Sequence, residues 1–89
     1  MTILDSEIQR ISAAVEQATG FGLEDMRARS RRLPVVRARI VVCHEIHKRG
    51  ASAREIGLAI YQNRASIGYL INRYQDEYDT SPIFREMAV

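Results

Sequence analysis

The chain has 89 residues, of which 46% are hydrophobic and 27% charged, which fits one small folded domain. Its longest apolar run, residues 40–43, is far shorter than the roughly 20 residues that span a bilayer, and no basic-then-apolar signal segment opens the chain. With a net charge of +2 and Cys43 as its one cysteine, it is expected to be a cytoplasmic protein that has neither a membrane span nor an internal disulfide.

The N-terminal segment predicts an amphipathic helix, because its apolar residues recur at helical spacing. Ser6 and Gln9 have the spacing of a capping box at its start, and Gly20 is expected to end it. A short helical turn is expected over residues 23–28. The apolar face of the first helix comprises Leu4, Ile8, Ile11, Val15 and Ala18.

Residues 27–34 are predicted to form a basic loop, since they offer no apolar face to bury. Pro34 suits the start of the next helix, predicted over residues 35–49, and Gly50 suits its C-terminal cap. The apolar positions of this helix spread widely around its axis, as they do in a helix at the centre of a bundle.

Two further helices are predicted after Gly50. Ser52 and Glu55 have capping-box spacing at the start of the first, and residues 61–63 form the turn. Asn63 is a good N-cap for a long helix over residues 64–78. A final short helix is expected over 83–87, so the fold class is an all-α compact bundle of five or six helices in a single domain, residues 1–89.

The charges are distributed unevenly along the sequence. Residues 27–73 contain 11 basic and two acidic side chains, a local net charge of +9, whereas the remaining residues contain two basic and nine acidic side chains, a net of −7. A basic patch on a small scaffold is typical of proteins that bind a polyanion, most often nucleic acid.

Residues 52–78 have the pattern of a helix-turn-helix. Gly57 is small where the two helices would cross, and Tyr61 departs from the glycine that many such turns prefer. The second helix would present its N-terminal residues to base edges in the major groove, where arginine suits guanine. The core between the helices would comprise Ile56, Ile60, Ile67 and Leu70, and the outward residues are Arg64, Ala65, Ser66 and Tyr69.

From about residue 8 to residue 78 the chain resembles the C-terminal DNA-binding domain of the bacterial replication initiator DnaA, in the Trp-repressor-like all-helical group. Glu55-Ile56-Gly57 matches the Glu-Ile-Gly of that family. Residues 35–39 are similar to its Val-Ala-Arg-Pro-Arg segment, and residues 62–67 fall on its signature Arg-Asp-His-Thr-Thr-Val.

The resemblance implies double-stranded DNA as the partner, in a cytoplasmic, nucleoid-associated setting. It implies minor-groove contacts by Arg29 and Arg31, with Arg32 beside them. It further implies phosphate contacts by Arg37, Arg39 and Ser52, and base reading by Asn63, Arg64, Ala65 and Ser66. The predicted DNA-binding set also includes Tyr69 and Arg73, the last cation of the basic stretch.

The signature is only partly kept, because arginine, asparagine and Ala-Ser replace histidine, aspartate and Thr-Thr. General DNA binding is therefore a stronger expectation than recognition of the initiator's usual DNA box. The chain has no phosphate-binding Gly-x-x-x-x-Gly-Lys loop, so no ATPase activity, cofactor or small-molecule substrate is expected.

Two alternatives stay open at this stage: RNA as the nucleic acid, although the stacking aromatics on strands of common RNA-binding modules are missing, and a function of another class. A protein-interaction module could keep the fold without reading DNA, as a stand-alone chain or as part of a larger initiator-like protein. Residues 43–47, Cys-His-Glu-Ile-His, invite a metal site, but the histidines have the wrong spacing for His-Glu-x-x-His and no fourth ligand is evident. We expect neither a metal nor an enzyme activity.

Overall fold

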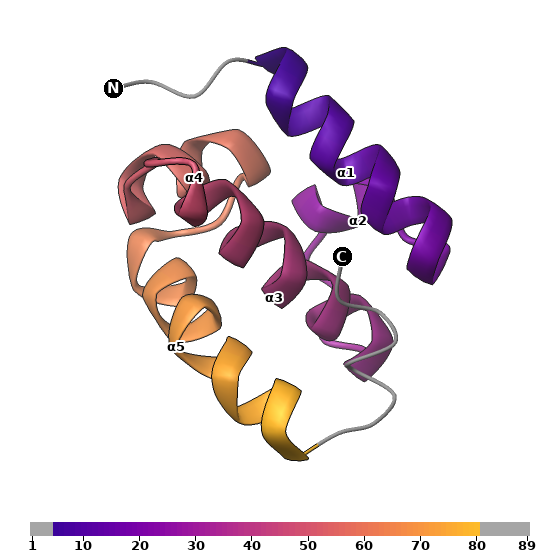
Figure 1. Cartoon of the computed structure of the whole chain (residues 1–89). Coiled ribbons are helices and arrows are strands. Elements are labelled where there is room, and N and C mark those ends of the chain that lie inside the picture. Colours follow the sequence, from indigo (N-terminus) through magenta and orange to yellow (C-terminus); the bar gives the residue numbers. More distant parts are fainter. Residues whose placement is uncertain (1–4, 81–89) are drawn as a thin grey trace.

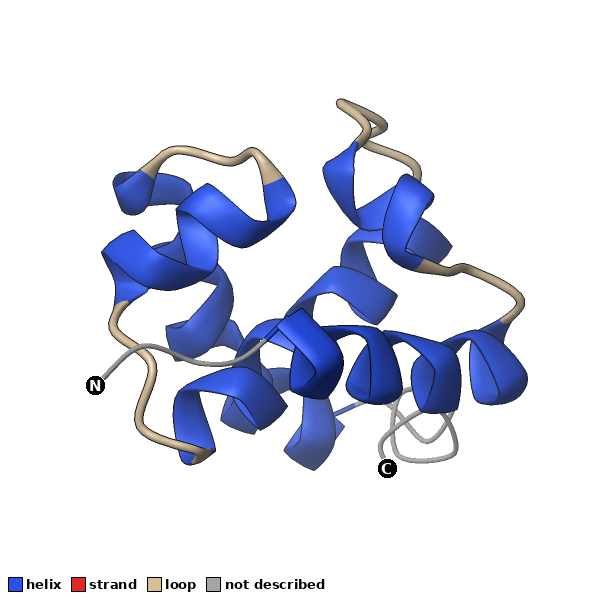
Figure 2. Cartoon of the chain, turned by 90° about the horizontal axis from the view of Figure 1, so that it is seen from above, coloured by secondary structure: helices blue, strands red, loops and turns tan. Residues whose placement is uncertain are grey.

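Every regular element in the described part of the chain, residues 5–80 of a computed structural model, is a helix (Figure 2). The five helices are α1 (Asp5–Thr19), α2 (Leu23–Arg27), α3 (Leu33–Lys48), α4 (Ala53–Ile60) and α5 (Arg64–Thr80). The all-α prediction is confirmed over these residues. Leu4 and the helix predicted over 83–87 lie outside them. None of the five helices is long and apolar enough to cross a bilayer.

Helix α3 is the centre of the bundle, as its apolar pattern predicts. It contacts all four other helices, and Figure 1 shows it running between α1 and α5. Val41, Val42, Cys43 and Ile46 are fully buried along it. Because α3 is enclosed on several sides, the positions of α2 and α5 are set by packing against one common element.

Glycines end α1 and α3 at the predicted positions. Gly20 has φ +84° and its N–H donates to the Glu16 carbonyl at 2.7 Å, and Gly50 has φ +98° and donates to the His47 carbonyl at 2.9 Å. This left-handed conformation has little steric cost for glycine. The capping box predicted for α1 is wrong, because α1 begins at Asp5 and Ser6 is its second residue.

The start of α4 and the start of α5 follow the predicted capping. At α4, the Ser52 hydroxyl accepts from the Glu55 N–H at 3.2 Å and the Glu55 carboxylate accepts from the Ser52 N–H at 3.1 Å. At α5, the Asn63 side-chain oxygen accepts from the Ser66 N–H at 2.7 Å. Tyr61 ends α4 in the left-handed region, with φ +58°, so its departure from glycine carries backbone strain of about 1 kcal/mol.

The contact between α4 and α5 is tight at Gly57. Ile56, Ile60 and Ile67 are fully buried between the helices, as predicted. A Cβ atom at Gly57 would stand 2.6 Å from the main-chain oxygen of Gln62, closer than real Cβ contacts come. The missing side chain therefore lets the connection between α4 and α5 fold back onto α4.

We expect Gly57→Ala to lower the free energy of unfolding by about 1–3 kcal/mol, because the new methyl group meets main chain that cannot rotate away. Gly68→Ala in α5 is the matched control: nothing lies within 4 Å of the position that its methyl group would take, and alanine should stabilise this helix by up to about 1 kcal/mol. Urea unfolding of both variants measures the two changes, and a Gly57→Ala variant as stable as the native protein would contradict the packing described.

Helices α3 and α5 also meet through aromatic rings. His44 of α3 stacks on Tyr74 of α5, with ring centroids 3.5 Å apart and planes 5° from parallel. Burial lowers the pKa of His44; nearby Glu45 opposes this shift, and Lys48 and His47 act in the same direction as burial. The neutral imidazole is therefore the form that the folded protein favours.

A stability loss on mild acidification follows, because the unfolded chain binds the His44 proton at a higher pH than the folded chain does. The contribution of neutral His44 to the free energy of unfolding is fully present above the pKa of about 6.5 that histidine has in the unfolded chain. It is lost as the pH falls through that value toward the lower pKa of the folded protein. Between about pH 7.5 and 5.5 we expect His44→Phe, which keeps a stacking ring, to show a flatter unfolding midpoint than the native protein. His47→Gln is the control, and an unchanged slope in His44→Phe would refute this origin.

Candidate nucleic-acid interface

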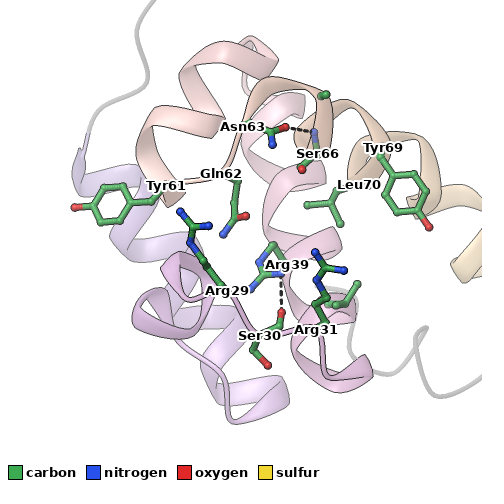
Figure 3. Close-up of a pocket in the computed structure, with 12 residues that line it drawn as sticks. Arg29, Ser30, Arg31, Arg39, Tyr61, Gln62, Asn63, Ser66, Tyr69 and Leu70 are labelled. Atoms are coloured by element: carbon green, nitrogen blue, oxygen red, sulfur yellow. Dashed lines mark hydrogen bonds between the residues drawn. The ribbon is translucent and has the colours of Figure 1, made fainter.

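A groove of about 620 Å³ opens between the basic loop and the N-terminal turn of α5. Figure 3 shows the two sides facing each other, with Arg29 and Arg31 opposite Asn63, Ser66 and Tyr69. Segments about 35 residues apart in sequence meet here. Seven predicted DNA-binding residues share this surface: Arg29, Arg31, Arg39, Asn63, Ala65, Ser66 and Tyr69.

The groove has the chemistry of a surface that receives anions. Among the described residues that line it, none is acidic. Arg29 and Arg31 are exposed on one side, and Tyr69, at 61% exposure, stands on the other. The Asn63 side-chain oxygen accepts from the Ser66 N–H, and its amide N–H groups can donate to a ligand. Val36 and Leu70 add apolar surface.

Arg39 also borders the groove, but its side chain is buried and donates its hydrogen bonds within the protein. This placement corrects the predicted phosphate contact. The residue is only 6% exposed. Its Nε donates to the Met26 carbonyl at 3.2 Å and its Nη1 to the Ser30 carbonyl at 3.2 Å. Its Nη2 donates to the carbonyls of Asp25 at 3.1 Å and Ala28 at 2.9 Å. One guanidinium therefore holds the main chain of residues 25–30, from which the basic loop extends.

Arg37 and Arg73, two further predicted DNA contacts, both lie against the carboxylate of Glu77. Arg73 Nη2 donates to one oxygen of Glu77, and Arg37 Nε lies 3.5 Å from the other. Glu77 is only 7% exposed. The two arginines neutralise a buried charge between α3 and α5, and neither lines the groove.

The three remaining predicted residues are exposed but lie outside the groove lining. Arg32 is the residue before α3, and Arg64 is the first residue of α5. Ser52 caps α4 with its hydroxyl, which leaves its hydroxyl hydrogen for any other partner. Arg64 is next to Asn63 and so belongs to the same end of α5 as the groove.

Two residues outside the predicted site link the sides of the groove. Gln62 Nε2 donates to the carbonyls of Met26 at 3.2 Å and Ala28 at 3.1 Å. Arg27 Nε donates to the Ala59 carbonyl at 3.1 Å, and its guanidinium lies 4.6 Å from the centre of the Tyr61 ring. Their partners are 32 to 36 residues away in sequence, so no local pattern could reveal them.

Residues 43–47, the Cys-His-Glu-Ile-His segment, lie in the C-terminal half of α3. Cys43 is buried, and burial raises the pKa of its thiol to about 12. His47 Nδ1 lies 3.0 Å from the Ala51 carbonyl, to which it can only donate. Within residues 5–80, no three metal-ligating side chains are grouped to hold an ion.

Comparison with known proteins gave no significant match to a family model, a curated protein or a solved structure. The function therefore has to be inferred from the groove and its residues.

We expect Arg39→Met to lower the free energy of unfolding by about 2–4 kcal/mol, because four carbonyls lose a charged donor in a buried site. Arg39→Lys should recover only part of the loss, since one ammonium cannot replace the planar guanidinium. Thermal unfolding measures both changes, with the exposed Arg32→Met as control. Equal stability of the Arg39→Met and Arg32→Met variants would show that the buried hydrogen bonds of Arg39 make no net contribution to the free energy of unfolding.

Proposed function

We propose that this domain binds double-stranded DNA, with the α4–α5 pair acting as a helix-turn-helix and the groove as the contact surface. One observation carries the proposal: Arg29 and Arg31 lie across one groove from the N-terminal turn of α5, and no acidic side chain of residues 5–80 lines that groove. Helices of this kind contact base edges through their N-terminal residues.

The arrangement of donors suits this role. Asn63 offers its amide N–H groups, and Arg64 offers an exposed guanidinium that can bond guanine O6 and N7 in the major groove. Ser66 and Tyr69 carry hydroxyls that bond bases or phosphates. With α5 in the major groove, Arg29 and Arg31 would reach the neighbouring backbone or the minor groove, and their charge would contribute affinity for any sequence.

The resemblance to the initiator's DNA-binding domain supports the same function. The helices, the basic loop and the connection at residues 61–63 occur in the order that the resemblance implies. Arg64 stands where that family has histidine, so the proposal is for binding of duplex DNA with a changed sequence preference. A cytoplasmic, nucleoid-associated setting follows from that proposal.

The protein-interaction alternative has weaker support. Leu58 and Leu33 are 70% and 54% exposed, but they belong to different helices, and scattered exposed leucines are ordinary on folded proteins. A docking surface for an apolar partner would need a larger continuous patch.

Fluorescence anisotropy with a random-core DNA duplex tests the proposal. With roughly six or more phosphate contacts, we expect affinity to fall by about three decades or more between about 50 and 200 mM salt. Replacing Arg29 and Arg31 by alanine should weaken binding at least about tenfold and make the salt dependence shallower, by roughly one unit of slope for each lost phosphate contact.

Arg10→Ala is the matched control, because Arg10 lies exposed on α1, outside the groove. Absence of binding at the lower salt concentration, or equal losses in Arg10→Ala and in the groove variant, would rule out the proposed interface.

A further inference from the structure

The two sides of the groove are tied together below its surface by hydrogen bonds to two carbonyl oxygens. Met26 O and Ala28 O each accept from Arg39 and from Gln62. Arg39 comes from α3 and Gln62 from the connection between α4 and α5. Since a carbonyl oxygen has two lone pairs, these four hydrogen bonds complete the capacity of both oxygens. We call this arrangement the carbonyl clamp.

Gln62 is the only member of the carbonyl clamp that lies next to the N-terminus of α5. Figure 3 shows its side chain extending from the connection toward the segment that carries Arg29, with Arg39 beside the same segment. Both of its amide N–H donors are used on the loop side, at 3.2 and 3.1 Å. Its neighbour Asn63 caps α5. Gln62 therefore binds the loop side of the groove, and the next residue, Asn63, caps the start of α5.

A second link runs beside the carbonyl clamp. Arg27, at the end of α2, donates to the Ala59 carbonyl near the end of α4 and covers the Tyr61 ring. Tyr61 holds the left-handed conformation that turns the chain into residues 62–63. The connection is therefore fixed from the loop side at two points. Gln62 lines the groove, whereas Arg27 does not.

We infer that Gln62 is a positioning residue that fixes the basic loop relative to the N-terminal turn of α5, so that both meet DNA as one preformed unit. This inference rests on the proposed DNA-binding function. A loop already held in place loses less conformational freedom on binding, which raises affinity without a direct contact. Gln62 would thus strengthen the contacts made by Arg29 and Arg31 although its own donors face the protein.

A positioning role can be separated from a general effect on folding. Without Gln62, both carbonyls would still accept from Arg39, so no buried acceptor would be left without a donor. Gln62→Met keeps the length of the side chain and removes its donors. Gln75→Met makes the same chemical change on α5, at an exposed residue whose amide bonds Asp79 and which lies outside the groove lining.

The experiment measures affinity for a random-core duplex at low salt for the native protein, Gln62→Met and Gln75→Met, with thermal unfolding of each. We expect Gln62→Met to bind about tenfold more weakly, which corresponds to about 1.4 kcal/mol, and Gln75→Met to bind like the native protein. Both variants should unfold close to the native midpoint.

A double-mutant cycle then distinguishes positioning from direct contact. In a background with Arg29 and Arg31 replaced by alanine, Gln62→Met should cost less than about twofold, because the loop no longer has contacts to position. The same tenfold loss in that background would overturn the inference in favour of a direct DNA contact. Native-like affinity of Gln62→Met would also overturn it. Failure of the native protein to bind any duplex would overturn the proposed function together with this inference.

Discussion

The placement of the basic loop depends on one buried guanidinium. Arg39 binds four main-chain carbonyls between residues 25 and 30, and the end of this segment, residues 28–30, lies outside any helix. A charged donor at 6% exposure is costly unless its hydrogen bonds are made. Here those bonds replace the secondary structure that the loop lacks. The groove exists because this segment is held opposite α5.

Several cations of the basic stretch, residues 27–73, form contacts inside the protein and are not available to a ligand. The local net charge of +9 of this stretch suggests a uniformly available positive surface. In the structure, Arg39 supports the loop, and Arg37 and Arg73 pair with the buried Glu77. The exposed arginines that remain include Arg29, Arg31 and Arg32 of the basic loop and Arg64 at the start of α5. Fewer cations are therefore available to a polyanion than the net charge suggests.

The sequence predicted the features that arise from local chemistry. Helical periodicity located the helices, and the side chains of Ser52 and Asn63 cap α4 and α5 as their spacing indicates. The core of the α4–α5 pair was also predictable, because Ile56, Ile60 and Ile67 follow the spacing of one helix face. These signals depend on residues at most a few positions apart.

The predictions that needed correction depend on distant contacts. An arginine in a basic run is normally solvated, so neither the burial of Arg39 nor its contacts 9 to 14 residues away could be expected from spacing. Asp76 and Asp79 are near Glu77 in the sequence, and no local pattern indicates that α3 places Arg37 beside Glu77. The role of Gln62 depends on main-chain carbonyls more than 30 residues earlier in the sequence. Every residue has such a carbonyl, so the sequence does not indicate which of them Gln62 will bind.

Titration of the isotope-labelled protein with a duplex, followed by amide chemical shifts, tests most directly whether the groove is the DNA-contacting surface. The account predicts that the largest shifts fall on residues 29–32 and 63–69, while those of α1 stay small and all shifts diminish with added salt. Shifts centred on α1, or none at low salt, would contradict it.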